Sequence, residues 1–317
     1  ATTELSYTTS LFKREYSSGS KYDGVVDEFG LKSKINYLDK SSFVLIGADY
    51  KSFKEEDVVN KKYSNKGFFA TNSNSFNGKT ILSESVRVDK YDAFADKNTG
   101  KVGIKHNFTK DFYLSSNGGI AYNVPTLYNL YSTDGNPNLK PETTKSFDFT
   151  AGYKELKATY FYNKIEDMID YDLTISKYGN LAGVSKLKGY EVDFKHNISD
   201  DALLSLNYTT LSAKNDKGKD LKRKAKENLK FGIDYYLTNK LTFGLNGEYV
   251  GERYNKDDNQ GAQTGKYTVA NGNINYTISK MFSTYLKIEN ITNKYYQTVD
   301  GYATSPRAYY AGVKVRF

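Results

Sequence analysis

Apolar and polar side chains alternate strictly along Arg307 to Phe317, the last stretch of the sequence. The polar positions carry Tyr310, Gly312, Lys314 and Arg316, and the apolar positions carry Tyr309, Ala311, Val313, Val315 and Phe317. A repeat of two residues places successive side chains on opposite faces, as in a β-strand with one apolar and one polar face. We therefore expect a strand here, in which Tyr309, Val313, Val315 and Phe317 face an apolar environment and serve assembly.

The same alternation recurs throughout the chain. About sixteen such segments can be counted from Thr3 onward, for example Leu229 to Leu237 and Leu241 to Tyr249. The least regular one, Gly67 to Phe76, is retained because Asn77-Gly78 follows it, and this dipeptide favours a two-residue hairpin turn. The pattern predicts an all-β protein of about sixteen antiparallel strands.

The connections between these segments alternate between short and long. Short ones are expected near Asp39–Ser41, Asn77–Gly78, Thr109–Asp111, Lys154–Glu155, Ser199–Asp201, Thr238–Lys240 and Ser279–Met281. Long polar ones are expected near Ser17–Asp27, Val58–Asn65, Asp92–Thr99, Val124–Thr143, Met168–Ser185, Ala213–Lys226, Glu252–Gly265 and Thr298–Pro306. Outer-membrane barrels have short periplasmic turns and long extracellular loops, whereas a soluble sandwich has no reason to gather its long loops at one end. We expect a transmembrane antiparallel β-barrel in the bacterial outer membrane, with its first strand running outward.

The composition agrees with this fold once the wet interior of a barrel is considered. With 26% charged and 38% hydrophobic residues, the chain holds no run near the ~18 apolar residues of a membrane-spanning helix. A barrel strand needs only alternate apolar residues. The 30 Tyr and 18 Phe suit the aromatic girdles of such a barrel. The chain begins directly on a strand and shows no signal peptide, so we expect a processed or truncated form.

Several functional classes find no support in the sequence. The absence of cysteine excludes disulfides and thiolate chemistry, and the two histidines, His106 and His196, lie on apolar registers without a Ser-His-Asp pattern. We expect no catalytic residue, metal site or cofactor. Much of the net charge of +8 comes from Ala213 to Lys226, which holds seven Lys or Arg and two Asp. That local patch argues against a nucleic-acid partner, and is either a solvated loop or an attraction for lipopolysaccharide or an anionic ligand.

The loop from Val124 to Thr143 carries the most distinctive motif. Gly135, Pro137 and Pro141 make it rich in turns, and its tyrosine rings suit a loop that folds toward a ligand, although structural packing is their alternative role. The candidate ligand-binding residues are Tyr128, Tyr131, Asn136 and Asn138, joined by Tyr171 and Tyr302 from other long loops.

The motif Gly119 to Glu142 (GIAYNVPTLYNLYSTDGNPNLKPE) resembles the barrel region of TonB-dependent outer-membrane receptors. Further agreement comes from Lys186–Asp201, Tyr249–Asn255 and Ile288–Phe317, the last resembling the cobalamin-receptor-like branch. The resemblance implies the C-terminal part of a barrel of about 22 strands that is occluded by an N-terminal plug. We expect residues 1–317 to form one transmembrane β-barrel domain, with the plug, the TonB-contacting box and the first barrel strands absent from this chain.

The resemblance implies a receptor and transporter for a scarce nutrient, cobalamin or a ferric siderophore, energised through TonB and not an enzyme. Its implied partners are the plug domain, TonB, outer-membrane lipid and lipopolysaccharide. The alternatives are a passive diffusion porin with a water-filled lumen, which an even strand number permits, and a non-transport barrel such as an enzyme or adhesin, of which the missing catalytic cluster argues against the enzyme.

Overall fold

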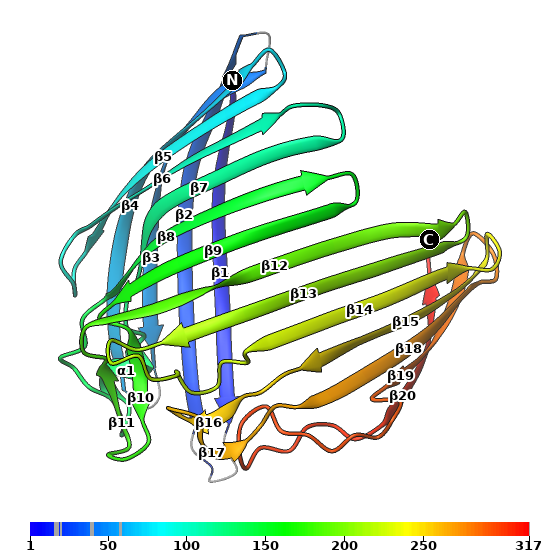
Figure 1. The fold of residues 1–317 in the computed structure, drawn as a ribbon. Helices are drawn as coiled ribbons and strands as arrows, with labels where there is room; N and C mark the ends of the chain where they lie inside the picture. Colours follow the sequence, from blue (N-terminus) through cyan, green and yellow to red (C-terminus); the bar gives the residue numbers. More distant parts are fainter. Residues whose placement is uncertain (16–18, 20, 39–40, 57–58, 317) are drawn as a thin grey trace. The chain divides into compact units, whose positions relative to one another are not determined.

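The computed structural model is built around one sheet of sixteen strands (Figure 1). It describes residues 1–15, 19, 21–38, 41–56 and 59–316. The strands of this sheet are β1 (Thr2–Glu15), β2 (Lys21–Tyr37), β3 (Ser42–Glu55), β4 (Lys61–Phe76), β5 (Thr80–Tyr91), β6 (Lys97–Asn107), β7 (Phe112–Asn123), β8 (Glu142–Tyr153), β9 (Leu156–Glu166), β12 (Val184–Ser199), β13 (Ala202–Lys214), β14 (Glu227–Tyr236), β15 (Leu241–Val250), β18 (Tyr267–Thr277), β19 (Phe282–Glu289) and β20 (Ala308–Val315). They pair antiparallel in chain order, which confirms the expected all-β fold and its sixteen strands.

Three short elements lie in the connections between these strands. Helix α1 (Leu127–Tyr131) follows β7, and two hairpins stand apart from the large sheet: β10 (Ile169–Asp172) with β11 (Lys177–Asn180), and β16 (Tyr254–Lys256) with β17 (Gln260–Gln263). None of the helices found in the described residues is long and apolar enough to cross a bilayer.

Contacts divide the chain into two compact units. The first comprises Ala1–Phe149 and Tyr162–Lys186, and the second comprises Thr150–Phe161 and Leu187–Phe317. Helix α1 and the hairpin β10–β11 belong to the first unit, and the hairpin β16–β17 belongs to the second.

The short turns lie where the sequence predicts them, apart from residues 39–40, which fall outside the described residues. At the weakest predicted strand, β4 leads through Asn77 and Gly78 into β5, and both turn residues have positive φ, 50° and 64°. Positive φ at both residues is what a type I′ turn requires, and the backbone N–H of Lys79 donates to the carbonyl of Phe76 at 3.0 Å. The strand and the place of the turn are confirmed, but the register pairs Phe76 with Thr80, so the connection has three residues and not the expected two.

Several long connections are shorter than expected, because the strands reach further into the polar segments. β2 begins at Lys21, β4 at Lys61 and β6 at Lys97, each inside a segment expected to be a loop, and residues 16–18, 20 and 57–58 of those segments lie outside the described residues. The backbone hydrogen-bond ladder between β1 and β2, for example, continues through polar pairs such as Glu15 opposite Lys21. Backbone hydrogen bonds hold these extensions, so polarity alone is a poor marker of where a strand ends.

In the first unit the sheet has one apolar and one polar face. Along β4, the side chains of Tyr63 and Asn65 are buried while Lys66 and Phe68 are exposed. The polar face, defined by Asp49, Asn65, Arg87 and Asp89 and their register mates, is therefore the packed one. The apolar face is defined by Ile46, Ala48, Phe68, Ala70, Val86 and Val88.

The final strand shows the same separation in the second unit. Tyr309 and Val313 are 64% and 66% exposed, and they stand opposite Ile288 and Thr284 of β19. Val315 pairs with Phe282 on the same face, while Phe317 lies outside the described residues. The predicted strand and its two faces are confirmed, and the role of its apolar residues in membrane assembly stays a prediction.

An arginine on the polar face ties three strands of the first unit together. Arg87 on β5 donates to both carboxylate oxygens of Asp49 on β3 at 2.6 and 2.8 Å, and to Asp89 at 2.7 Å. Asp89 is 1% exposed and also accepts from the amide of Asn65 on β4 at 3.0 Å. Gly67 leaves the necessary space, because a Cβ there would stand 2.0 Å from the guanidinium.

Replacing Arg87 with Gln should destabilise the first unit, because it leaves two carboxylates close together without their cation. The expected loss in free energy of unfolding is about 3 kcal/mol, measured by urea titration of the full chain in detergent micelles. Lys195→Gln removes the same charge from an exposed position and should cost less than about 0.5 kcal/mol. Equal losses in the two variants would show that total charge, and not this cluster, determines stability.

Candidate functional site

Helix α1 is held firmly at the end of β7 by buried residues. Pro125 is fully buried and its carbonyl accepts from the hydroxyl of Tyr63 at 3.4 Å, while Leu127 and Leu130 are buried beneath the helix. Thr126 caps the helix N-terminus in a capping box with Asn129. Because the cap satisfies backbone groups that a five-residue helix cannot satisfy itself, the segment has a defined conformation.

The chain after α1 folds back onto the helix. The backbone N–H of Asn136 donates to the carbonyl of Asn129 at 2.8 Å. Gly135 makes this return possible, since a Cβ there would lie 2.7 Å from backbone atoms of Leu130 and Tyr131. Such a close approach of two backbone segments requires glycine.

The hairpin β10–β11 braces this returning segment (Figure 1). The amide of Asn136 donates to the carbonyl of Tyr178 at 3.1 Å, and the hydroxyl of Tyr171 donates to Asp134 at 3.2 Å. Asn180 accepts from the backbone N–H of Lys140 at 2.9 Å and donates to its carbonyl at 2.9 Å. Two loops that are far apart in the sequence therefore form one structure in the first unit.

A cavity of about 620 Å³ lies between this loop structure and the polar face of β1–β4. The ring of Tyr128 meets the ring of Tyr22 edge to face at 5.4 Å, and Tyr22 meets Phe12 at 6.1 Å. The lining includes Ser10, Phe12, Arg14, Tyr22, Gly24, Val26, Phe53, Tyr63, Asn123, Thr126, Leu127 and Tyr128. A cavity lined by aromatic rings and by the guanidinium of Arg14 suits an amphipathic ligand that has flat apolar parts and an anionic or polar edge.

The six predicted binding residues have different surroundings. Tyr128 lines the cavity, and Tyr131 is exposed with the Lys61 ammonium 5.8 Å from its ring centroid. Asn136 and Tyr171 hold the loop structure together, which is the packing alternative. Asn138 is exposed, and its backbone N–H donates to the Asn136 side chain. Tyr302 is 68% exposed and belongs to the second unit.

Phe12, Arg14 and Tyr22 line the cavity but were not predicted from the sequence. They lie on β1 and β2, at the ends that adjoin the expected first long loop. All three have even numbers, as do Ser10 and Val26, which lie on the polar face. Because side chains alternate between the two faces along a strand, this numbering alone could have placed them on the polar face. Nothing in the sequence indicated that α1 would stand over them.

The segment Ala213 to Lys226, called the basic loop of the second unit below, is held in place by ion pairs. Lys226 contacts Glu252 at 3.0 Å and Asp220 at 3.6 Å, and Lys214 contacts Asp220 at 3.3 Å. The hydrogen bond from Lys226 lowers the pKa of Glu252, and that bond in turn raises the pKa of Lys226. Burial acts to raise the pKa of Asp220, but the hydrogen bonds from Asn259 and Lys214 outweigh it and the pKa is lowered.

Neither histidine lies in a metal-binding cluster. The ring of His106 is 2.7 Å from the Thr80 hydroxyl, and His196 is 3.7 Å from Glu155. Within the described ranges, no group of three or more His, Asp or Glu side chains is arranged to hold a metal ion.

These features are typical of one class of protein. Its members have a sheet of antiparallel strands with one apolar and one polar face, and long connections that fold into loop structures. The chain belongs to the TonB dependent receptor-like β-barrel family, whose model matches residues 1–291. The resemblance seen in the Gly119–Glu142 motif is thereby confirmed.

The relatives with this fold are longer proteins. The chain is 28% identical over 249 residues to the vitamin B12 transporter BtuB of Vibrio cholerae, a match that spans 75% of this chain and 40% of that protein. Among solved structures, it superposes on the siderophore receptor PirA of Pseudomonas aeruginosa with a TM-score of 0.77 and 16% identity. For the ferric enterobactin receptor PfeA of the same organism, the TM-score is 0.78 and the identity 18%. Both matches cover 99% of this chain and 59% of the receptor.

Substituting Gly135 with Ala should loosen the loop structure around α1, because the new methyl group would collide with backbone atoms. Hydrogen exchange of amides between Leu127 and Leu139 should accelerate at least about tenfold, as overpacking of this kind costs about 1–3 kcal/mol. Gly179→Ala is the matched control, since no atom lies within 4 Å of its Cβ position. Unchanged exchange in the Gly135 variant would contradict the proposed close approach.

Acid should open the basic loop of the second unit. The lowered pKa values of Asp220 and Glu252 mean that their ion pairs stabilise the loop fully above about pH 4.5 and lose this effect as pH falls through the lowered values. Amide exchange around Leu221, corrected for intrinsic rates, should therefore stay slow from pH 7 to about 5 and rise below about pH 4. A Glu252→Gln variant should show faster exchange already at pH 7, and a flat pH profile in the native protein would contradict this account.

Proposed function

We propose that this chain forms the wall of an outer-membrane receptor that captures a scarce nutrient at its extracellular end. The observation that carries the proposal is the aromatic cavity beneath α1, which combines a rigid loop structure with rings that meet edge to face and with Arg14. No chemical step is needed, because the role of such a site is to bind and release.

The ligand we propose is cobalamin or a ferric siderophore. Vitamin B12 is the cargo in the name of the relative with 28% identity, and the structural neighbours are siderophore receptors. Cobalamin carries a flat conjugated corrin ring and catecholate siderophores carry aromatic rings, both beside polar edges, which fits a cavity of about 620 Å³ as one part of a larger binding surface. Family membership supports a plug domain inside the barrel and energisation through TonB as further parts of the same proposal.

The apolar face of the sheet is proposed to contact outer-membrane lipid. Its side chains are large, exposed and contiguous, as Leu31, Phe68 and Val86 show with 51%, 54% and 63% exposure. In water such a surface would aggregate, whereas in a bilayer it is stabilised. Tyr309, Val313 and Val315 belong to the corresponding face of the last strand and would anchor it during assembly.

The proposal is tested with outer-membrane vesicles that carry the natural gene product. Equilibrium binding of labelled cyanocobalamin and of ferric enterobactin is measured for the native protein and for Tyr22→Ala and Tyr128→Ala. Each substitution should weaken binding of the recognised probe by about tenfold or more, the usual cost of losing an aromatic contact. Tyr295→Ala, at an exposed tyrosine of the second unit, is the matched control and should bind normally.

Three outcomes would count against this function. If the native protein binds neither cyanocobalamin nor ferric enterobactin, the result contradicts the proposed ligand classes. Normal binding by both cavity variants would place the site elsewhere, and Tyr302→Ala then tests the exposed loop of the second unit. Steady conductance of the native protein in planar bilayers would indicate the passive porin instead of a plugged receptor.

A further inference from the structure

Three consecutive basic residues, Lys222, Arg223 and Lys224, lie in the basic loop of the second unit. They are called the basic run below, and the side chains of Arg223 and Lys224 are exposed. Proteases with the specificity of trypsin cleave after Lys or Arg. Exposed loops with polar residues are where such cleavage concentrates. By sequence and exposure, the basic run is therefore a candidate for cleavage.

The backbone of the basic run is hydrogen-bonded to the hairpin β16–β17, which belongs to a different connection. The N–H of Lys222 donates to the carboxylate of Asp257 at 2.7 Å, and the N–H of Arg223 donates to the carbonyl of Tyr254 at 2.8 Å. The side chain of Arg223 adds a bond from its Nε to the amide oxygen of Asn255 at 2.8 Å. Tyr254 and Asn255 belong to β16, and Asp257 follows directly after it. The hairpin thus holds two successive N–H groups of the basic run.

Arg223 has a backbone conformation that does not fit the cleft of a protease. Its φ is 58°, in the left-handed region that residues other than glycine rarely adopt. A peptide that is bound as a strand has strongly negative φ and uses its own backbone groups to bond with the cleft. In the folded loop, the N–H groups of Lys222 and Arg223 already bond to the hairpin. Cleavage therefore requires the basic run to leave the hairpin first.

Further contacts on both sides of the basic run connect it to the same hairpin. The N–H of Asp258 donates to the carbonyl of Asp220 at 2.8 Å, and the amide of Asn259 donates to the carboxylate of Asp220 at 2.8 Å. On the other side, the N–H of Lys226 donates to the carbonyl of Glu252 at 3.0 Å. Local unfolding proceeds in contiguous cooperative segments, so the basic run and the hairpin should open together.

The tip of the same loop is held mainly by its own bonds. The side chain of Asn215 accepts from the N–H of Lys217 at 3.1 Å and from that of Lys219 at 3.0 Å. The N–H of Gly218 donates to the carbonyl of Asn215 at 3.1 Å. Lys217 and Gly218 are exposed. The peptide bond after Lys217 is thus a reference site whose cleavage should not depend on the hairpin.

We propose that the basic run is a cleavage site for a protease that recognises paired basic residues, and that the hairpin β16–β17 is a latch that keeps this site closed. In the cut after Arg223, water adds across the peptide bond. Its hydroxyl joins the new carboxyl group of Arg223, and its proton joins the new amino group of Lys224. The pairing of β13 with β14 lies outside the basic run, so the sheet stays hydrogen-bonded after the cut. The latch thus controls the state of one loop, a role distinct from nutrient capture in the first unit.

Limited digestion of the full chain in detergent micelles with trypsin tests the latch. Mass spectrometry distinguishes cuts in the basic run from the reference cut after Lys217. In the native protein, cleavage of the basic run should be at least about tenfold slower than the reference cut. Asp257→Ala removes the acceptor of the Lys222 N–H and should accelerate cleavage of the basic run about tenfold or more. Hydrogen bonds to charged groups are strong, and the cleavage rate follows the population of the open form.

Two matched variants separate the latch from an effect of charge. Asp216→Ala removes an exposed carboxylate from the same loop and should leave both cuts at their native rates. Asp257→Asn keeps an acceptor oxygen without the charge and should restore most of the protection. Cleavage of the native basic run as fast as the reference would overturn the latch, and so would equal acceleration by Asp216→Ala.

Hydrogen exchange on the same samples shows whether the opening is local. In Asp257→Ala, the amides of Arg223 and Asp258 should exchange faster together, while the amides of β14 keep their native rates. If β14 also exchanges faster, the milder Asn255→Ala variant decides, because it removes only the bond to the Nε of Arg223. It should accelerate cleavage of the basic run about threefold or more, and a native rate in this variant would contradict the latch.

Discussion

Backbone pairing in continuous register from strand to strand determines which side chains meet on each face of the sheet. Asp49 stands opposite Gly67, and Gly67 opposite Asp89, so one parity passes from β3 through β4 to β5 without interruption. Because strand side chains alternate with a period of two, a slip of one residue would exchange the faces. It would move Arg87 away from Asp49 and expose its charge on the apolar side. The hydrogen-bonded ladder and the separation of polar from apolar side chains therefore stabilise each other.

The loop structure near the cavity follows the same logic on a smaller scale. Three residues hold the loop structure in its conformation. Thr126 caps α1, Gly135 allows the backbone to return close to the helix, and the side chain of Asn136 joins the returning segment to Tyr178. A binding surface that is already rigid loses less conformational entropy when a ligand binds. A predicted contact residue such as Asn136 can thus be important for recognition by shaping the site and not by touching the ligand.

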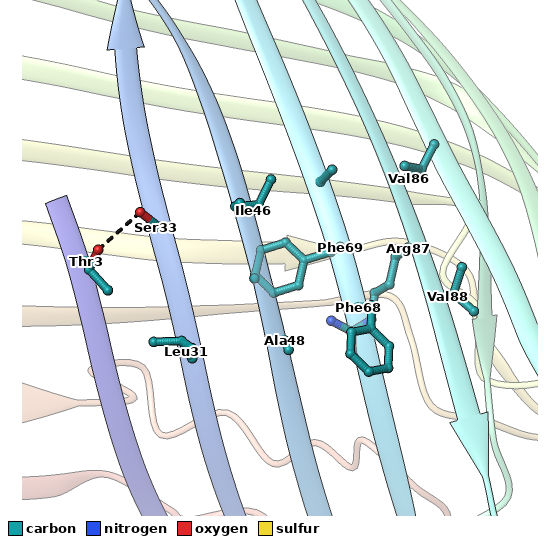
Figure 2. Close-up of a pocket in the computed structure, with 12 residues that line it drawn as sticks. Thr3, Leu31, Ser33, Ile46, Ala48, Phe68, Phe69, Val86, Arg87 and Val88 are labelled. Carbon is teal, nitrogen blue, oxygen red and sulfur yellow. Dashed lines mark hydrogen bonds between the residues drawn. The ribbon is translucent and has the colours of Figure 1, made fainter. Parts of the chain in front are cut away.

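The two faces of β3 and β4 have different surroundings along the same strands (Figure 2). Tyr63 points into the packed side beside the cavity, while Lys62, its chain neighbour, lies on the opposite face. Changes on one face leave the other nearly intact, so the proposed capture of a nutrient and the proposed contact with lipid can vary independently. In a strand, adjacent side chains point to opposite faces of the sheet and are separated by it. Adjacent side chains of a helix are not separated in this way.

The sixteen strands of the large sheet, their two faces and the place of the turn at Asn77 could be predicted from the sequence, because a period of two and a turn dipeptide are local properties. The sequence pattern misplaced the starts of β2 and β4, where polar residues continue a ladder. The contact of Arg87 with Asp49, which is 38 residues away, and that of Tyr22 with Tyr128 across the cavity could be seen only in the folded protein. Such contacts depend on register between strands and on how loops pack, and no short stretch of sequence contains that information.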